Sequence, residues 1–193
     1  MHISNERYFN ERQRHDLALR MIRHEARTCT IRSCTGLTDD RIRRLYKTYA
    51  SHMPAAPVRR RRGKSPRQVS FFLRNARAQL ESSMLASVFT TFGLWRSQSG
   101  ARHSSLPTPS VSLPSIEGGL LFCDAYETHR QLLSNADISF EHAWFLLQLL
   151  TRSAVLHAVR CRHCDSQYLR DRVNVLRRAC PVCVLKRPDA QRR

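Results

Sequence analysis

The sequence predicts a mainly α-helical protein with a small cysteine-rich module at its C-terminal end. Apolar residues recur at helical spacing over most of the 193 residues, and two Cys-x-x-Cys pairs lie close to the end of the chain. The third observation is the charge, because 33 Lys and Arg residues oppose 15 Asp and Glu residues and leave a net charge of +18. The hydrophobic share of 41% is sufficient for a folded core.

Four helices are predicted in the N-terminal helical region, residues 1–96. In the longest of them, Phe72, Ala76, Leu80 and further apolar residues recur every four positions and form one apolar face. Gly36 is expected to end the second helix. In the third, Ile42, Leu45 and Tyr49 are expected to form the buried stripe. The predicted helices cover residues 7–27, about 29–34, 39–49 and 68–94.

A linker and a second helical region follow. Residues 97–119 hold 7 Ser, 3 Pro and 3 Gly, a composition that predicts a linker or an insertion without packed elements. Residues 120–159 are predicted to form a helical core hairpin, with helices at about 120–134 and 139–159.

The strongest chemical signal is the spacing of four cysteines in residues 160–193, the predicted metal module with its basic tail. Cys161 and Cys164 form one Cys-x-x-Cys pair, and after fifteen intervening residues Cys180 and Cys183 form another. Two such pairs complete the tetrahedral set of four thiolates that Zn²⁺ prefers, and a closed site of this kind is structural. The sequence therefore predicts one structural zinc ion per chain in a zinc-ribbon-like module. Strands of a short hairpin are expected at 168–169 and 173–175.

The sequence gives weaker signals for the role of the three remaining cysteines and for the cellular location of the protein. Cys29, Cys34 and Cys123 lack paired spacing and are interpreted as small apolar residues. A redox dithiol is the alternative for the paired cysteines, although a thioredoxin-type site needs only one pair. The longest candidate for a membrane span, residues 143–150, is far too short to cross a bilayer, and the N-terminus lacks a signal-peptide core. An intracellular, reducing location is therefore expected.

Residues 31–49 have the outline of a helix-turn-helix motif. A short helix, a glycine-containing turn and a capped helix follow one another, and in such motifs the second helix meets base edges in the major groove. An ordinary solvated amphipathic helix has the same pattern and is the alternative. The candidate DNA-binding residues here are Thr38, Arg41, Arg43, Arg44 and Lys47.

The proline-bounded loop of residues 54–67 is a second basic constellation. Its four adjacent arginines repel one another in any compact arrangement, so the run is expected to be solvated or paired with anions. We expect it to contact phosphates or to enter a minor groove, and a loop with only nonspecific attraction to anions is the alternative. The candidate DNA-binding residues here are Arg59, Arg60, Arg61, Arg62, Lys64 and Arg67.

The charge is divided unevenly along the chain. Residues 1–70 carry a net charge of +11, residues 71–150 carry −1 and residues 151–193 carry +8. Two basic ends around a neutral apolar middle favour nucleic acid as the ligand. The sequence contains no Gly-rich phosphate loop, nucleophile elbow or His-Glu-x-x-His motif, so an enzyme is not predicted. A zinc-ribbon RNA-binding protein and a helical protein-interaction scaffold are the alternatives to a DNA-binding regulator.

Three stretches of the chain resemble the FlhC family of bacterial flagellar transcriptional activators. The first runs from Gly36 to Lys47 and includes Arg-Ile-Arg-Arg-Leu-Tyr-Lys. The second runs from Pro54 into the Phe71-Phe72 pair, and the third joins Ala143-Trp144 to the two cysteine pairs. Together the three stretches span most of the chain outside residues 97–119.

This resemblance implies a mostly helical subunit with a zinc domain. The subunit is expected to assemble with an FlhD-like subunit into a hetero-oligomer in the bacterial cytoplasm, to bind promoter DNA and to recruit RNA polymerase to flagellar operons, without a membrane partner. By the same resemblance the zinc ligands are Cys161, Cys164, Cys180 and Cys183.

Overall fold

The computed structural model is mainly helical, as the sequence predicts. It describes residues 2–52, 58–61, 63–96, 112–152, 155–172 and 179–186. The chain divides into two compact units, of which the first comprises Met1–Ser65 with Val111–Asp124 and the second comprises Pro66–Ser110 with Ala125–Arg193. Within the described residues, no helix has the length and apolar character that crossing a membrane requires.

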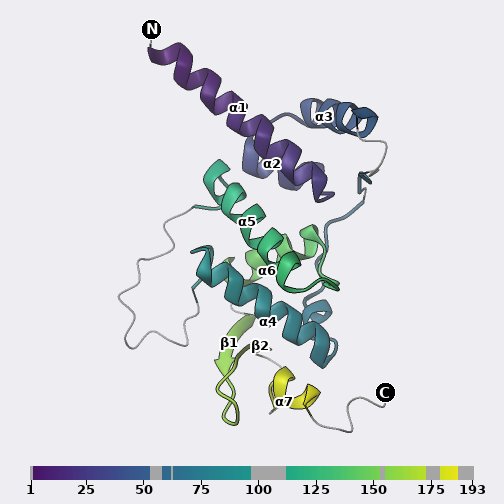
Figure 1. Cartoon of the computed structure of the whole chain (residues 1–193), viewed down its shortest axis with the longest axis vertical. Coiled ribbons are helices and arrows are strands. Elements are labelled where there is room, and N and C mark those ends of the chain that lie inside the picture. Colours follow the sequence, from purple (N-terminus) through teal and green to yellow (C-terminus); the bar gives the residue numbers. More distant parts are fainter. Residues whose placement is uncertain are drawn as a thin grey trace. The chain divides into compact units, whose positions relative to one another are not determined.

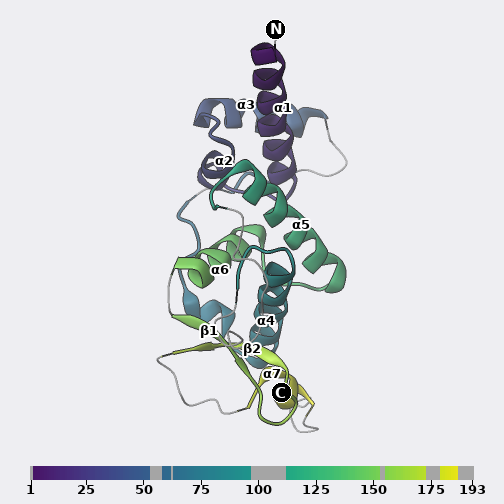
Figure 2. The ribbon, with the colours of Figure 1, turned by 90° about the vertical axis from the view of Figure 1, so that its left-hand side faces the viewer.

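The first unit contains α1 (His2–Arg23), α2 (Thr28–Thr35) and α3 (Asp39–His52), together with the start of a later helix. Both α2 and α3 pack against α1 (Figures 1 and 2). The buried side chains come from all three helices: Leu17, Met21 and Ile22 from α1, Ile31 from α2, and Ile42 and Tyr46 from α3.

The junction between α2 and α3 has the predicted helix-turn-helix outline. Gly36 adopts the left-handed conformation, with φ of 69°, and its N–H donates to the carbonyl of Arg32, which ends α2. Thr38 Oγ1 accepts a hydrogen bond from the N–H of Arg41 at 3.4 Å and caps the first turn of α3. Local sequence signals therefore specify both ends of this turn.

The buried face of α3 differs from the predicted one. Ile42 and Tyr46 are buried, whereas Leu45 and Tyr49 are only half-buried. The Tyr46 hydroxyl donates a hydrogen bond to the carbonyl of Ala26, in the α1–α2 turn. This contact favours Tyr46 over Tyr49 as the core aromatic residue, because a buried phenol needs a hydrogen-bond acceptor.

Helix α5 (Ile116–Leu132) contributes residues to both units and begins four residues before the predicted start. Ser115 Oγ accepts from the N–H of Gly118 at 3.0 Å at the start of this helix. A Cβ atom added at Gly119 would lie 2.8 Å from Leu17 Cδ2 and 3.1 Å from Cys34 Cβ. The glycine therefore permits α5 to approach the other helices of the first unit closely.

The second unit contains η1 (Val69–Phe72), α4 (Ala76–Thr91) and α6 (Phe140–Arg152). The continuous helix predicted for 68–94 is thus divided into two elements. The division occurs at Asn75, whose side chain accepts the N–H of Ala78 at 2.8 Å and caps α4. The core of this unit includes Phe72, Leu85, Phe89, Phe140 and Leu147.

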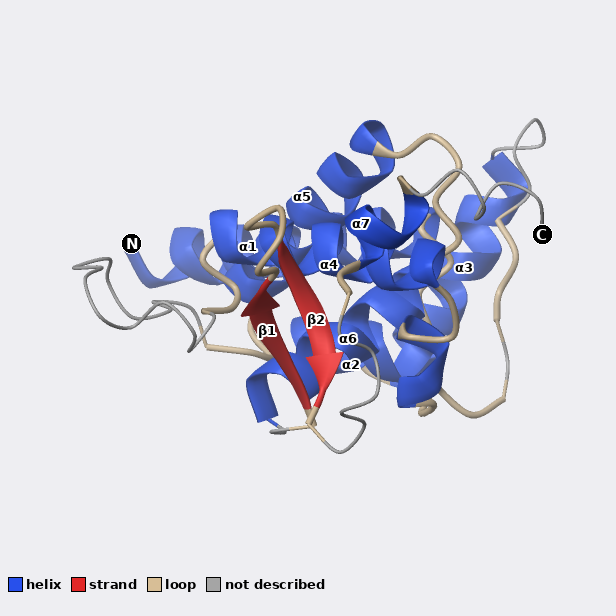
Figure 3. Ribbon diagram, turned by 90° about the horizontal axis from the view of Figure 1, so that it is seen from below, coloured by secondary structure: helices blue, strands red, loops and turns tan. Residues whose placement is uncertain are grey.

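A two-stranded antiparallel sheet follows α6 and is visible from below in Figure 3. Its strands are β1 (Leu156–Arg160) and β2 (Gln167–Asp171). The prediction of a helix up to residue 159 is wrong in its last part, because α6 ends at Arg152 and 156–160 is a strand. The prediction for 168–169 is confirmed, whereas 173–175 lies outside the described residues. The last element is the short helix α7 (Pro181–Leu185).

Helix α5 also buries a titratable residue, His129, whose side chain is fully inaccessible. Burial, and to a lesser extent the positive charge of Arg130, lowers the pKa of His129 to about 4 from the ordinary value of 6.5. The native protein therefore holds this imidazole neutral at pH values where the unfolded chain protonates it. Stability is expected to rise with pH between about 4 and 6.5 because the unfolded state binds more protons in that range.

This expectation is tested by comparing the wild type with a His129→Leu variant. Urea unfolding of both proteins is measured at several values between pH 4.5 and 7.5. The wild type is expected to lose more stability than the variant on acidification, since leucine has no proton to bind. Parallel pH profiles for the two proteins would contradict the assignment.

Candidate metal centre and nucleic-acid interface

The first cysteine pair lies at the tip of the β1–β2 hairpin. Strand β1 ends at Arg160, and the N–H of Cys161 continues the ladder by donating to the carbonyl of Ser166 at 3.0 Å. The N–H of Asp165 donates back to the carbonyl of Cys161 at 3.0 Å, with Asp165 in the left-handed conformation at φ of 56°. The tight turn between the strands therefore positions Cys161 and Cys164.

The second pair lies at the start of α7. Cys180 precedes the helix as its N-cap, Pro181 occupies the first helical position, and Cys183 follows in the first turn. The N–H of Cys183 donates to Cys180 Sγ at 3.3 Å. Because proline fixes its own φ near the helical value, the Cys-Pro-x-Cys sequence favours this turn locally.

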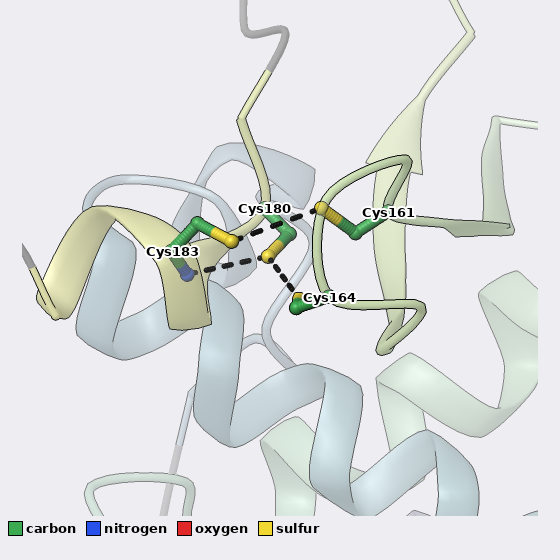
Figure 4. Close-up of side chains that lie close together, drawn as sticks. All are labelled: Cys161, Cys164, Cys180 and Cys183. Carbon is green, nitrogen blue, oxygen red and sulfur yellow. Dashed lines mark hydrogen bonds between the residues drawn. The ribbon is translucent and has the colours of Figure 1, made fainter.

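The four sulfur atoms converge, as Figure 4 shows. All four lie within 4.8 Å of one another, with 3.9 Å between Cys161 and Cys183 and 3.4 Å between Cys164 and Cys180. In a tetrahedron with metal–sulfur bonds near 2.3 Å, neighbouring sulfurs are about 3.8 Å apart. Disulfide sulfurs lie much closer, at about 2.05 Å, and all four cysteines are free thiols. The four side chains therefore fit a tetrahedrally coordinated metal ion.

The surroundings of the thiols lower the pKa values of the first cysteine pair and raise those of the second pair. Hydrogen bonds, chiefly from the backbone N–H of His163, lower the pKa of Cys161 to about 6, and the neighbouring Ser166 lowers the pKa of Cys164. Burial raises the pKa of Cys180, and the adjacent thiol of Cys164 raises the pKa of Cys183 to about 12. Without a cation, crowding thus opposes ionisation of the second pair. A bound divalent ion would reverse that opposition, because it stabilises all four thiolates together.

The buried cluster around the four cysteines is too small to stabilise the site alone. Beside Cys161 and Cys180, Tyr168 is the buried residue of this cluster, and Val159 and Val182 are only partly buried. A module of this size ordinarily needs a metal or disulfides, and a metal bound by four thiolates has no open position for substrate. The arrangement can therefore hold a metal ion in a structural role.

Two polar side chains of α4 join the module to the rest of the second unit. Gln79 Nε2 donates to the carbonyl of Leu169 at 2.8 Å, and the N–H of Leu169 donates to Ser83 Oγ at 2.9 Å. Ser83 Oγ in turn donates to the carbonyl of Gln79 at 2.5 Å, which closes a ring of three hydrogen bonds. All three residues are buried. The outer edge of β2 is therefore covered by α4 instead of being exposed.

The basic residues predicted on α3 differ in their surroundings. Arg41 pairs with Glu11 of α1 at 2.5 Å, and Arg43 pairs with Asp40 at 2.7 Å. Arg44 and Lys47 are exposed and form no ion pair with any residue in the described part of the chain. Of the side chains predicted on this helix, these two retain their full charge for a ligand.

The predicted basic loop is only partly a free loop. Arg61 pairs with Glu25 at 2.8 Å, and Arg60 Nη2 lies 3.5 Å from Thr28 Oγ1. Arg59 and Lys64 have exposed side chains without an ion pair to the described residues. Of the other two predicted residues, Arg62 lies outside the described residues and Arg67, which is exposed, belongs to the second unit.

Sequence reasoning missed three groups of residues at these sites. Glu25 and the Gln79–Ser83 pair act through partners between 34 and 90 positions away in the chain, and no local pattern indicates such contacts. Ser166 follows the first cysteine pair, and its position is a usable signal because its hydroxyl lies within reach of a cysteine sulfur two residues away. Of the three cysteines outside the Cys-x-x-Cys pairs, Cys34 and Cys123 are buried, which fits their interpretation as small apolar residues, whereas Cys29 is exposed.

Comparison with known proteins identifies a family for the chain. The family model described as "Flagellar transcriptional activator (FlhC)" matches residues 3–192, nearly the whole chain. A search of curated proteins finds no match.

Proposed function

Because the chain belongs to the FlhC family of flagellar transcriptional activators, we propose that it binds promoter DNA as one subunit of a hetero-oligomer with an FlhD-like partner. The assembled complex recruits RNA polymerase to flagellar operons in the bacterial cytoplasm. The four cysteines hold one structural zinc ion, which is the metal that a closed tetrahedral set of thiolates prefers. Apart from this ion the protein needs no cofactor and carries out no catalysis.

The DNA-binding part of the proposal rests on helix α3 and its exposed cationic side chains. It follows a glycine turn in a helix-turn-helix outline, its first turn is capped by Thr38, and it presents Arg44 and Lys47 to solvent without an ion pair to the described residues. In a helix-turn-helix protein this helix enters the major groove. Arg41 and Arg43 contribute less charge because carboxylates already neutralise them.

The proposal predicts how binding changes when α3 loses charge. Full-length protein with its FlhD-like partner is titrated onto a labelled flagellar promoter fragment over a series of salt concentrations. Replacing Arg44 and Lys47 together by alanine is expected to weaken binding and to reduce the slope of log K against log salt by about 0.9 for each phosphate that no longer meets a cation. A base contact by Arg44 would instead reduce the preference for promoter over scrambled DNA.

A matched control is Arg12→Ala, which removes an exposed positive charge of α1 that is paired with Asp16 at 3.7 Å. This variant is expected to keep the slope within about 0.3 of the wild type. Equal slopes for the α3 double variant and the wild type would overturn α3 as the DNA contact. Preference for RNA of the same length, or no binding with and without the partner, would overturn the proposed DNA-binding function.

A further inference from the structure

The arginine segment, by which we mean the described residues 59–61 and 63–65, lies along the turn between α1 and α2. One carboxylate of that turn makes two of the contacts, since Glu25 Oε2 pairs with Arg61 at 2.8 Å and Oε1 accepts the backbone N–H of Arg59 at 3.4 Å. The turn and the start of α2 make three further contacts, which are Arg60 to Thr28, Arg27 to the carbonyl of Gly63, and Cys29 to Ser65.

The backbone at Glu25 is unusual for its residue type. Its φ of 57° lies in the left-handed region, which glycine and asparagine adopt more readily than glutamate. The turn itself is held by main-chain hydrogen bonds from Glu25 to Ile22 and from Ala26 to Met21. A glutamate at a position better suited to glycine is unusual, and here its carboxylate makes the pair of contacts to the arginine segment.

We propose that Glu25 is a positioning residue that holds the arginine segment in place for DNA phosphates. The proposal rests on the DNA-binding function proposed above. Glu25 offsets the repulsion among adjacent arginines by neutralising Arg61, and it fixes the main chain at Arg59. Arg59 and Lys64 then contact phosphates, whereas Arg61 does not.

The physical advantage of this arrangement is that the arginine segment is already ordered before it binds DNA. A free run of arginines loses conformational freedom when it meets DNA, and that loss weakens binding. Here one carboxylate with 28% side-chain exposure holds the segment against the folded turn beforehand. The cost is the charge of one arginine of the segment, Arg61, whereas Arg59 and Lys64 remain exposed without an ion pair to the described residues.

The direction in which one substitution changes DNA affinity distinguishes a positioning role of Glu25 from an effect of its charge alone. Glu25→Gln makes the protein more positive, so electrostatics alone predicts tighter binding to DNA. Positioning predicts the opposite, a loss of roughly three- to ten-fold in affinity, because the segment must be ordered during binding. The matched control is Asp16→Asn, which removes a carboxylate from α1 without touching the segment and is expected to bind equally or more tightly.

Further variants test Arg59 and Arg61, the two residues that Glu25 contacts. Arg59→Ala is expected to lower the salt slope by about 0.9, whereas Arg61→Ala weakens binding with a slope unchanged within about 0.3. The double variant Glu25→Gln, Arg61→Ala is expected to bind no more weakly than Arg61→Ala alone, because the two residues form one unit. A charge exchange, Glu25→Arg with Arg61→Glu, restores the ion pair and recovers part of the affinity.

The measurements use full-length protein with its FlhD-like partner, and thermal unfolding confirms that each variant is folded. Wild-type protein that fails to bind DNA would overturn the proposed function. Wild-type protein that binds, together with a Glu25→Gln variant that binds as tightly or more tightly, would overturn the positioning role alone. A slope reduced by about 0.9 in Arg61→Ala would show that Arg61 itself contacts phosphate.

Discussion

Replacing Cys161 or Cys180 by serine is expected to abolish metal binding and to unfold the C-terminal module. The wild type should contain about one zinc ion per chain, and each variant well under a quarter of that amount. The reason is geometric, because the sulfur atoms lie within 4.8 Å of one another and three thiolates cannot close the tetrahedron. Structural zinc contributes on the order of 10 kcal/mol to the folding of small modules, far more than the few buried side chains here can replace.

The measurement combines metal analysis of purified protein with amide hydrogen exchange. Loss of the metal should remove protection from β1, β2 and α7, while α1 and α2 in the first unit keep theirs. Chelation of the wild-type metal should give the same pattern. A matched control is Cys29→Ser, since this cysteine is outside the cluster and should leave the zinc content unchanged.

Two results would contradict the metal assignment. One is a wild-type protein that is folded and metal-free throughout its C-terminal module. The other is retention of about one zinc ion per chain in both the Cys161→Ser and the Cys180→Ser variants, which would place the metal elsewhere.

The parts of the protein that were predictable from sequence are those whose signals are local. The turn from α2 to α3 depends on Gly36 and Thr38, which act within three or four residues of their partners. The cysteine cluster was equally predictable from sequence, because the spacing of Cys161, Cys164 and the second pair already indicates two tight turns.

Two of the incorrect predictions, the end of α6 and the buried face of α3, depend on contacts between distant segments. Residues 156–160 read Leu-His-Ala-Val-Arg and extend the apolar pattern of α6, so nothing local ends the helix at Arg152. They form a strand because β2 pairs with them, with Ala158 opposite Leu169, and because burial then alternates along the strand. Likewise, Tyr46 replaces Tyr49 in the core because Ala26 offers it an acceptor twenty positions away.

The second large effect is expected at the ring of hydrogen bonds between α4 and β2. Replacing Ser83 by alanine leaves the buried N–H of Leu169 without its acceptor. Replacing Gln79 by alanine leaves the carbonyl of Leu169 without its donor. Leaving a buried polar group unpaired costs about 1–3 kcal/mol, so each variant is expected to be destabilised by that amount. Together the two substitutions should cost less than the sum of both, because they share Leu169.

Ser87→Ala is the matched control for the ring. Ser87 is exposed to solvent on the same helix, and its hydroxyl donates only to the carbonyl of Ser83, at 3.1 Å. Alanine is the better helix former, so this variant is expected to stay within about 0.5 kcal/mol of the wild type. Urea unfolding of the metal-loaded full-length protein measures all the variants.

The ring also determines how far the effect of the metal reaches. With the zinc removed by a chelator the hairpin is expected to unfold, so Ser83→Ala should then cost almost nothing relative to the chelated wild type. If the cost is the same with and without the chelator, the ring does not depend on the metal and the hairpin is stable alone. If the cost appears only with metal bound, occupancy of the four cysteines stabilises α4 through Gln79 and Ser83, and loss of zinc weakens the second unit well beyond the module itself.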